Sequence, residues 1–165
     1  MYDNFITSEL YFFKTKLSDY YFGNTYLYKI KPRIGKTKFI LKLIEEFCLN
    51  QKIPSLFFSL EMAKTTFERK KLLDTSNPNL FIIDTPNLNI EDLCSIATDY
   101  IYKNKIKLVF INYLSLLTLE EHIDYAEKEK IILQKLKEFS KKNNIIIISS
   151  DKLSEEYDET IKYYS

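Results

Sequence analysis

The chain has 165 residues, with 24 basic and 23 acidic side chains and a net charge of +1. This length suffices for one domain with a buried core. The near-zero charge excludes a protein-wide basic field that would attract nucleic acid, and no run reaches the roughly 20 apolar residues that a membrane-spanning helix needs.

Cysteine and histidine are too sparse to predict a metal site. Cys48 and Cys94 lie far apart, and His122 is the single histidine. This spacing favours free thiols in a reducing compartment over a disulfide or a ligand set. The N-terminal segment MYDNFITSEL lacks the charged head and apolar run of a signal peptide. We therefore expect a cytoplasmic protein with no membrane contact.

Apolar runs alternate with helical patterns along the chain. Apolar residues at helical spacing predict helices, and Asn89, followed by acidic residues, is the expected N-cap of the third one. The predicted strands are residues 25–30, 53–60, 79–84, 106–117 (running into a loop) and 144–150. The predicted helices are residues 37–50, 62–74, 88–104 and 127–143.

Almost continuous apolar strands separated by helices predict an α/β fold, with a mostly parallel sheet of about five strands and helices on both faces. No internal linker divides the chain, so residues 1–165 are expected to form a single domain. Residues 1–22 would be an N-terminal extension, and residues 151–165 a polar tail, either helical or without regular structure. Ligands of such folds bind at the carboxyl ends of the strands.

Between the first predicted strand and helix, the chain reads KIKPRIGKTKF. A strand, a tight turn and a helix N-terminus are the parts of a phosphate-binding loop with the pattern G-x-x-x-x-G-K-[ST]. Ile30 stands where that pattern has its first glycine, so a helix start that reads Gly-Lys-Thr by chance is the alternative. The predicted nucleotide-binding residues are Pro32, Arg33, Ile34, Gly35, Lys36, Thr37 and Lys38.

FFSLEM, at residues 57–62, is the most specific of five segments, in order along the chain, that together resemble one known family. That family is the DnaB-type replicative DNA helicases, which have a RecA-like P-loop NTPase core. The others resemble its Walker A loop, an Asp-Thr-Pro strand end, its Walker B strand, and its last helix with the strand before a Ser-Gln-Leu motif. They are GNTYLYKIKPRIGKT (23–37), LFIIDTPNLNIEDL (80–93), LVFINYLSLL (108–117) and LKEFSKKNNIIIISSDKLSEE (136–156).

The resemblance implies ATP and Mg²⁺ as cofactors and assigns roles to three residues. Lys36 matches the residue that contacts the nucleotide phosphates, and Thr37 matches the magnesium ligand. Glu61 matches the glutamate that polarises the attacking water, a role that suits a carboxylate near the γ-phosphate. A solvated carboxylate at a strand end is the alternative for Glu61.

The chain departs from the family at positions that matter for hydrolysis. Asn112 stands at the Walker B aspartate position, so it keeps an acceptor oxygen but loses the charge that favours magnesium. Asp84 and Asp151, at strand ends, are the candidates to replace that charge. Lys152 stands at the position of the family's γ-phosphate-sensing glutamine. The loop that would face DNA carries acidic residues that repel phosphates, with a solvated tail as the alternative: Glu155, Glu156, Asp158 and Glu159.

Parts of the family's ring-forming machinery have no counterpart in this sequence. The segment between Met62 and Leu80 is shorter than its equivalent, and no segment matches the later strands with their arginine finger, or the N-terminal domain and linker helix. We therefore expect weak ATPase activity at most and no autonomous unwinding. Local basic clusters remain as candidates for nucleic-acid contact, with solvated faces as the alternative. They contain Lys29, Lys31 and Arg33; Arg69, Lys70 and Lys71; Lys103, Lys105 and Lys107; and Lys141 and Lys142.

Two functional hypotheses follow, and the sequence leaves both open. The first is a helicase-type ATPase domain that binds ATP–Mg²⁺ and acts in DNA replication, with single-stranded DNA as a partner. The second is a non-catalytic relative that acts through protein contacts, for example on a full-length helicase ring. A small P-loop kinase is a weaker third hypothesis, because the chain shows neither a glycine-rich first turn nor an arginine-bearing lid.

Overall fold

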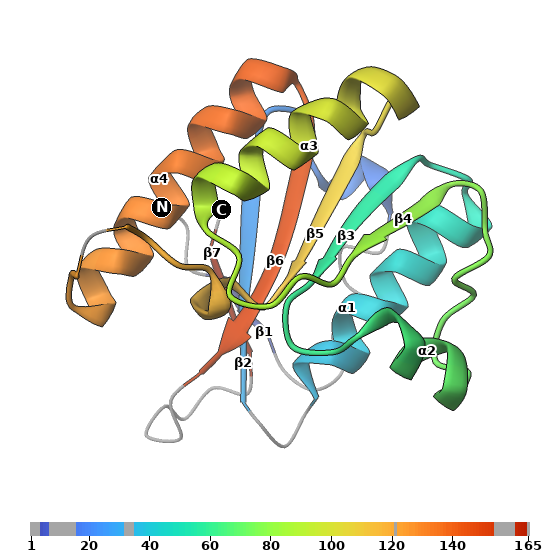
Figure 1. The fold of residues 1–165 in the computed structure, drawn as a ribbon, viewed down its shortest axis with the longest axis horizontal. Helices are drawn as coiled ribbons and strands as arrows, with labels where there is room; N and C mark the ends of the chain where they lie inside the picture. Colours follow the sequence, from blue (N-terminus) through green and yellow to red (C-terminus); the bar gives the residue numbers. More distant parts are fainter. Residues whose placement is uncertain (1–3, 7–15, 32–34, 121, 154–160, 165) are drawn as a thin grey trace.

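The computed structural model describes residues 4–6, 16–31, 35–120, 122–153 and 161–164. One seven-stranded sheet runs through the molecule in the order β1-β7-β2-β6-β5-β3-β4 (Figure 1). The strands are β1 (Asn4–Ile6), β2 (Thr25–Ile30), β3 (Ser55–Ser59), β4 (Leu80–Ile83), β5 (Leu108–Asn112), β6 (Ile146–Lys152) and β7 (Ile161–Tyr164).

The α-helices are α1 (Lys36–Ile44), α2 (Lys64–Lys70), α3 (Ile90–Asn104) and α4 (Tyr125–Asn143). Helix α1 continues directly into the π-helix η3 (Glu45–Asn50), and the 3-10 turns are η2 (Leu17–Asp19) and η4 (Leu114–Leu116). The five strands and four helices predicted from the sequence are all present, with ends that shift by a few residues. Asn89 caps α3 as expected, because its side chain accepts a hydrogen bond from the Glu91 N–H.

The five predicted strands form the parallel core of the sheet, from β2 through β6, β5 and β3 to β4. This core with its covering helices confirms the predicted fold class. The sheet also has two strands that were not predicted: β7 pairs antiparallel with β2, and β1 pairs antiparallel with β7. The expectation of a helical or irregular tail is therefore wrong for Ile161–Tyr164, which extends the sheet beyond β2.

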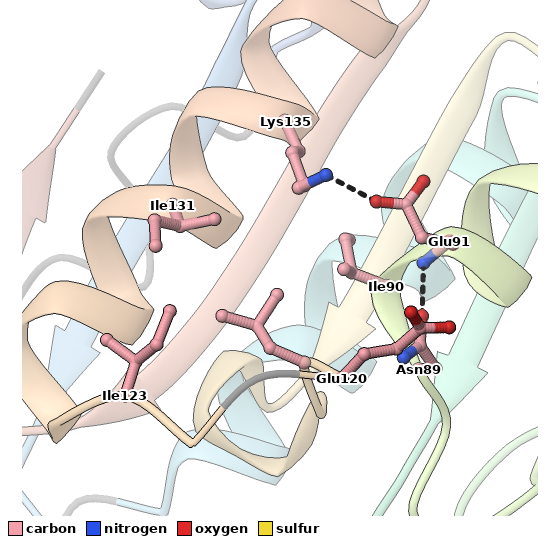
Figure 2. Close-up of a pocket in the computed structure, with 8 residues that line it drawn as sticks. Asn89, Ile90, Glu91, Glu120, Ile123, Ile131 and Lys135 are labelled. Carbon is pink, nitrogen blue, oxygen red and sulfur yellow. Dashed lines mark hydrogen bonds and ion pairs between the residues drawn. The ribbon is translucent and has the colours of Figure 1, made fainter.

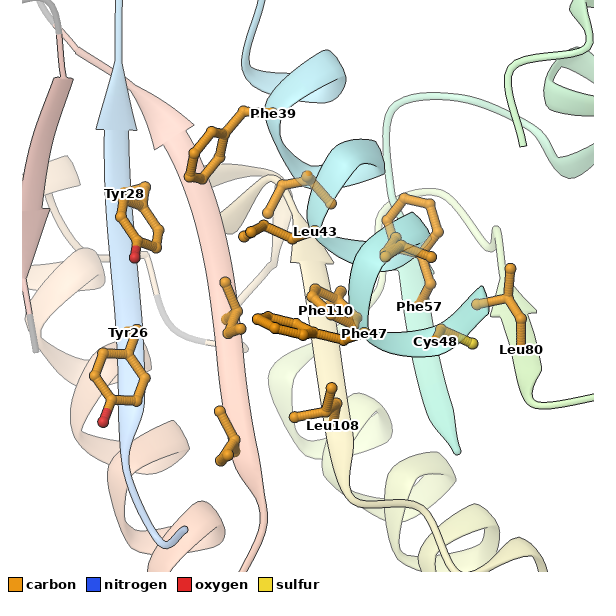
Figure 3. Packing of buried hydrophobic residues seen from close by; sticks show 14 of the residues in the cluster. Tyr26, Tyr28, Phe39, Leu43, Phe47, Cys48, Phe57, Leu80, Leu108 and Phe110 are labelled. Atoms are coloured by element: carbon orange, nitrogen blue, oxygen red, sulfur yellow. The ribbon is translucent and has the colours of Figure 1, made fainter. Parts of the chain in front are cut away.

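Each face of the sheet has its own apolar core, because successive strand side chains point to opposite faces. On one face, α1 and η3 pack Phe39, Leu43 and Phe47 against β2, β5 and β6 (Figure 3). The rings of Tyr28 and Phe39 lie 4.8 Å apart between centroids, which fixes the start of α1 against β2. On the other face, α3 and α4 cover residues such as Leu27 and Val109. The sheet is therefore the middle layer of three.

Several turns adopt left-handed backbone conformations without glycine. Lys71, Lys105 and Asn144 have φ values of 53°, 57° and 51°, and they end α2, α3 and α4. The two glycines of the chain, Gly23 and Gly35, also have positive φ. Because the chain has only two glycines, lysine and asparagine take the left-handed positions at helix ends, at a modest cost in backbone strain.

Candidate functional site

The predicted phosphate loop lies at the carboxyl end of β2, where the chain turns into α1. Gly35 is the N-cap of α1, with φ 82°, and its carbonyl accepts the Phe39 N–H at 3.1 Å. Glycine is the residue that adopts this φ without strain. The first N–H groups of a helix are unpaired within the helix and form a ready anion site. The backbone around Gly35 is thus suited to a phosphate.

Three of the seven predicted loop residues, Gly35, Thr37 and Lys38, can be followed fully in the structure. Thr37 lies in the first turn of α1, partly buried, and Lys38 is exposed on the same helix. Lys36 begins α1, but its side chain lies outside the described residues, as do Pro32, Arg33 and Ile34. Their contacts with nucleotide therefore stay predictions.

Asn112, at the Walker B position, is fully buried at the end of β5, and its side chain is hydrogen-bonded to α1. Its Nδ2 donates to Thr37 Oγ1 at 3.1 Å, and its Oδ1 accepts the Ser150 hydroxyl at 2.8 Å. Its backbone carbonyl accepts the Leu60 N–H at 2.9 Å. The side chain therefore links three elements, α1, β5 and β6, at one point beside the loop.

This arrangement changes what Thr37 can offer a metal ion. An aspartate would accept the Thr37 O–H and leave both oxygen lone pairs available. As placed, the amide of Asn112 donates to that oxygen, so it occupies one lone pair and directs a partial positive charge toward it. Mg²⁺ favours oxygen ligands and anionic partners. The donor set fits a phosphate well and Mg²⁺ less well.

Asp151 cannot replace the missing carboxylate, since it faces the other side of the sheet. Ser150 and Asp151 are consecutive in β6, so their side chains point to opposite faces. Asp151 accepts the Ser115 hydroxyl at 2.8 Å and the Lys152 N–H at 2.8 Å. Among the described residues, its Oδ2 has no hydrogen-bond partner. Burial raises the pKa of this carboxyl above its ordinary value of 3.8, although the Lys152 and Ser115 hydrogen bonds act against that shift.

Asp84, the second candidate replacement, serves another purpose. Its carboxylate accepts the Lys64 N–H at 2.8 Å and so satisfies the first turn of α2. It follows β4, which β3 separates from β5. Two strand spacings of about 4.8 Å therefore lie between it and Asn112. The expectation that Asp84 or Asp151 supplies the magnesium carboxylate is wrong on this geometry.

Glu61 lies two residues beyond the end of β3, and its side chain is exposed. Ser59, the last residue of β3, is paired in register with Asn112. Burial, with smaller contributions from the carboxylates of Glu61 and Asp151, raises the pKa of Tyr113, the residue after Asn112. Glu61 thus follows the carboxyl end of β3, on the same side of the sheet as Thr37 and Asn112.

Ser150 was not identified from the sequence, although a signal was present. It stands in the apolar run NIIIISS, where two serines occupy the carboxyl end of a buried strand. Both are completely buried. A buried hydroxyl requires a partner, and for Ser150 that partner is Asn112. Lys152, at the glutamine position, is exposed at the end of β6, and the acidic residues 155–159 lie outside the described residues.

A hollow of about 210 Å³ lies on the α3–α4 face, away from the loop (Figure 2). Apolar and polar side chains line it in equal number, and an ion pair between Lys135 and Glu91 closes one side. The other lining residues are Ile90, Leu119, Ile123, Ile131, Asn89 and Glu120. Its lining holds no nucleophile, and α1 is on the opposite face of the sheet. This hollow is therefore separate from the phosphate loop.

Within the part of the chain that the structure describes, no three His, Cys, Asp or Glu side chains cluster as metal ligands would. The same described residues include no helix that is long and apolar enough to span a membrane.

The fold is that of a RecA-like ATPase domain. One solved ATPase domain superposes with a TM-score of 0.70 at 21% identity, over 82% of this chain and 59% of that chain. A DnaB-like replicative helicase, solved in a study of its interactions with primase, superposes with a TM-score of 0.69 at 22% identity, over 82% of this chain and 40% of that one.

The family model of the DnaB-like helicase C-terminal domain matches residues 68–162, which is more than half of the chain. The chain belongs to this family. It is 28% identical over 148 residues to the replicative DNA helicase DnaB of Treponema pallidum (strain Nichols), covering 72% of this chain and 34% of that protein. It is also 28% identical over 163 residues to a probable replicative DNA helicase of Trieres chinensis, covering 79% of this chain and 36% of that protein. The chain thus spans about a third of the length of these curated relatives.

Proposed function

We propose that the chain is a nucleotide-binding domain of the replicative-helicase type, which binds ATP at the loop before α1 and hydrolyses it weakly or not at all. The observation that carries this proposal is the hydrogen bond from Asn112 to Thr37. It keeps the phosphate loop and the Walker B strand together, but with a neutral side chain where hydrolysis needs a charge.

The phosphate half of the proposal rests on backbone geometry. Gly35 in the left-handed region and the N-terminus of α1 provide N–H donors for phosphate oxygens. Lys36, by family resemblance, adds a positive charge there. Mg²⁺, when bound with ATP, would neutralise charge on the β- and γ-phosphates, with Thr37 as its protein ligand.

The hydrolytic half rests on charge. Glu61 supplies an exposed carboxylate just beyond the carboxyl end of β3, on the side of the sheet where water would have to be oriented. Asn112 contributes no negative charge, and neither Asp84 nor Asp151 is positioned to do so. We therefore propose slow turnover at most, and a role in DNA replication in the cytoplasm in which single-stranded DNA is a partner.

The same neutral Asn112 favours a second candidate. The domain would then be a non-catalytic relative that acts by protein contacts, for example by docking on a full-length helicase ring. In both cases residues 1–165 act as one domain.

Calorimetry of ATP binding, with and without Mg²⁺, tests the proposal on the wild-type chain and on Lys36→Ala. Micromolar binding that disappears in Lys36→Ala would support a working phosphate loop. A phosphate-release assay then separates weak hydrolysis from none. Absence of nucleotide binding in both proteins would overturn the proposal and leave the protein-contact function, testable by co-elution with a full-length helicase of the family. ATP-dependent unwinding of a forked duplex by this chain alone would contradict both candidates.

A further inference from the structure

The hydroxyl group of Thr37 is used as an acceptor by the protein itself. Asn112 Nδ2 donates to Thr37 Oγ1 at 3.1 Å, so one lone pair of that oxygen is taken. A hydroxyl that accepts a hydrogen bond can still donate its own hydrogen. No described residue accepts that hydrogen, and the Thr37 side chain is only partly buried. The Thr37 O–H is therefore available to a ligand at the phosphate loop.

The amide of Asn112 is held from both ends. Its Oδ1 accepts the Ser150 hydroxyl at 2.8 Å, while its Nδ2 donates to Thr37. Asn112 and Ser150 are both completely buried, so bulk water does not compete for either hydrogen bond. The donor end of the amide thus stays directed at Thr37, and the acceptor end is occupied by Ser150.

The floor beside Thr37 is a row of neutral side chains. Ser59, Asn112 and Ser150 are paired in register across β3, β5 and β6, so their side chains share the face that α1 covers. The Ser59 hydroxyl donates to the Met62 carbonyl at 2.5 Å. In the turn after Ser59, Glu61 is exposed, and the family resemblance assigns it to water rather than to the metal. Protein sites for Mg²⁺ usually include one or two carboxylates, and this row contains none.

Positive charge for a phosphate is available from the chain itself. None of residues 30–44 is acidic, and Lys31, Arg33, Lys36 and Lys38 lie in or beside the loop in sequence. Lysine binds phosphate as a point charge, and arginine binds it through paired N–H donors. Lys29 is not counted with them, because it forms an ion pair with Glu129 at 2.8 Å. These cations can neutralise phosphate charge that Mg²⁺ otherwise neutralises.

We propose that this site takes a nucleotide in its metal-free form, and that the Thr37 O–H donates to a phosphate oxygen in place of binding Mg²⁺. The inference rests on the nucleotide-binding function proposed above and adds the form in which the nucleotide binds. The N–H groups at the start of α1 and the Thr37 O–H all donate, which suits phosphate oxygens. Mg²⁺ instead needs oxygen lone pairs and negative charge, and Asn112 takes one lone pair of Thr37 and adds no charge. Magnesium that enters with a nucleotide has to compete with Asn112 for Thr37.

Calorimetry of the full wild-type chain with AMP-PNP, a non-hydrolysable ATP analogue, separates binding from turnover. The affinity in EDTA should be at least equal to the affinity in excess Mg²⁺. Tighter binding in Mg²⁺ than in EDTA would overturn this inference and leave the proposed nucleotide-binding function standing. Absence of binding in both buffers would overturn the inference and the proposed function together.

The role of the hydroxyl is tested by Thr37→Val, which keeps the shape of the side chain and removes the O–H. In EDTA this variant should bind AMP-PNP about tenfold more weakly, since a hydrogen bond to a charged group is lost. Thr37→Ser, which restores a hydroxyl, should recover most of that affinity. The matched control is Thr98→Val, at an exposed position of α3 where the hydroxyl donates to the Cys94 carbonyl at 2.7 Å. This control should bind as the wild type does.

A metal-ligand role for Thr37 gives the opposite pattern. Thr37→Val would then lose affinity in Mg²⁺ and none in EDTA, and that result would overturn the proposal. Thermal melts in EDTA establish that each variant is folded, because Thr37→Val leaves the buried Asn112 Nδ2 without its acceptor. If Thr37→Val does not fold, the comparison of the two buffers on the wild type and on Thr37→Ser still decides between the two roles.

Discussion

The side-chain amide of Asn112 donates to the Thr37 hydroxyl across 3.1 Å, and so joins the end of β5 to the first turn of α1. A neutral donor thus contacts the oxygen that the family resemblance assigns to magnesium. The buried Ser150 hydroxyl holds the other end of the same amide. This contact makes the metal dependence of nucleotide binding the most direct property to measure.

Asn112→Asp should strengthen the effect of Mg²⁺ on ATP binding. The new carboxylate would accept the Thr37 O–H and add a negative charge beside the metal position, and we expect at least a tenfold gain, about 1.4 kcal/mol. Without metal, the same buried charge should lower the melting temperature. Titration of Mg²⁺ at fixed ATP, together with melts in EDTA and in Mg–ATP, measures both effects.

Asn144→Asp is the control for that experiment. It adds the same charge at the exposed end of α4, near the amino ends of the strands and away from Thr37. It should leave the magnesium dependence unchanged. Equal magnesium dependence in Asn112→Asp and the wild type would show that Thr37 does not bind the metal.

Ser150→Ala should destabilise the fold and disturb nucleotide binding together. It leaves the buried Asn112 Oδ1 without its 2.8 Å donor, which costs about 1–3 kcal/mol. The neighbouring Ser149→Ala is a matched control on the opposite face, where the hydroxyl donates to the Ile111 carbonyl at the longer distance of 3.3 Å. Urea denaturation should show a larger loss of unfolding free energy for Ser150→Ala than for Ser149→Ala. Calorimetry should show a changed Mg–ATP affinity for Ser150→Ala alone. Equal losses with unchanged nucleotide binding would assign Ser150 a purely structural role.

The strands and helices of the parallel core could be predicted because each is identified by a pattern within its own stretch of sequence. Apolar runs such as LVFIN and the helical spacing of α4 identify elements without knowledge of their partners. Strand β7 was missed because IKYY is short and follows a polar segment, and its stability comes from pairing with β2. Short strands of this kind depend on tertiary contact more than on their own composition.

The site was only partly predictable for a related reason. The motif around Gly35 and the identity of Asn112 could be read directly from the sequence. The orientation of Asp151 could not, because alternation separates Ser150 from Asp151 but does not say which of them faces α1. That choice is set by the register of β6 between β2 and β5, which pairs Asn112 with Ser150.

Gly35→Ala should reduce both stability and ATP affinity. An added Cβ would be 3.5 Å from Lys38 Cβ, an ordinary contact, so the cost comes from the φ of 82°. A left-handed alanine costs about 1–2 kcal/mol, and relief of that strain would move the N-terminus of α1. Gly23→Ala is a close control: its φ is 86°, its nearest contact is 3.7 Å, and it lies at the other edge of the sheet. Melts and calorimetry should show similar stability losses for both variants but an affinity loss for Gly35→Ala only.

Asp151→Asn should stabilise the protein by an amount that grows with pH. Burial raises the pKa of Asp151 in the folded state above its ordinary value of 3.8. Below pH 3.8 the carboxyl is protonated in both states and contributes nothing. As the pH rises, the unfolded state ionises first, so the wild type loses stability until the folded pKa is passed. The neighbouring charges that bear on this titration are Glu129 and Lys29.

An asparagine keeps an oxygen to accept the Ser115 hydroxyl, and it has no charge to bury. Urea denaturation from about pH 4 to about pH 8 measures the free energy of unfolding of Asp151→Asn and of the wild type. The difference between the two free energies should be small at the acidic end, increase in favour of the variant, and then become constant. Asp84→Asn is the control for the removal of one negative charge, because the Asp84 carboxylate is exposed. A constant difference between Asp151→Asn and wild type across this range would mean that burial does not hold the Asp151 proton in the folded protein.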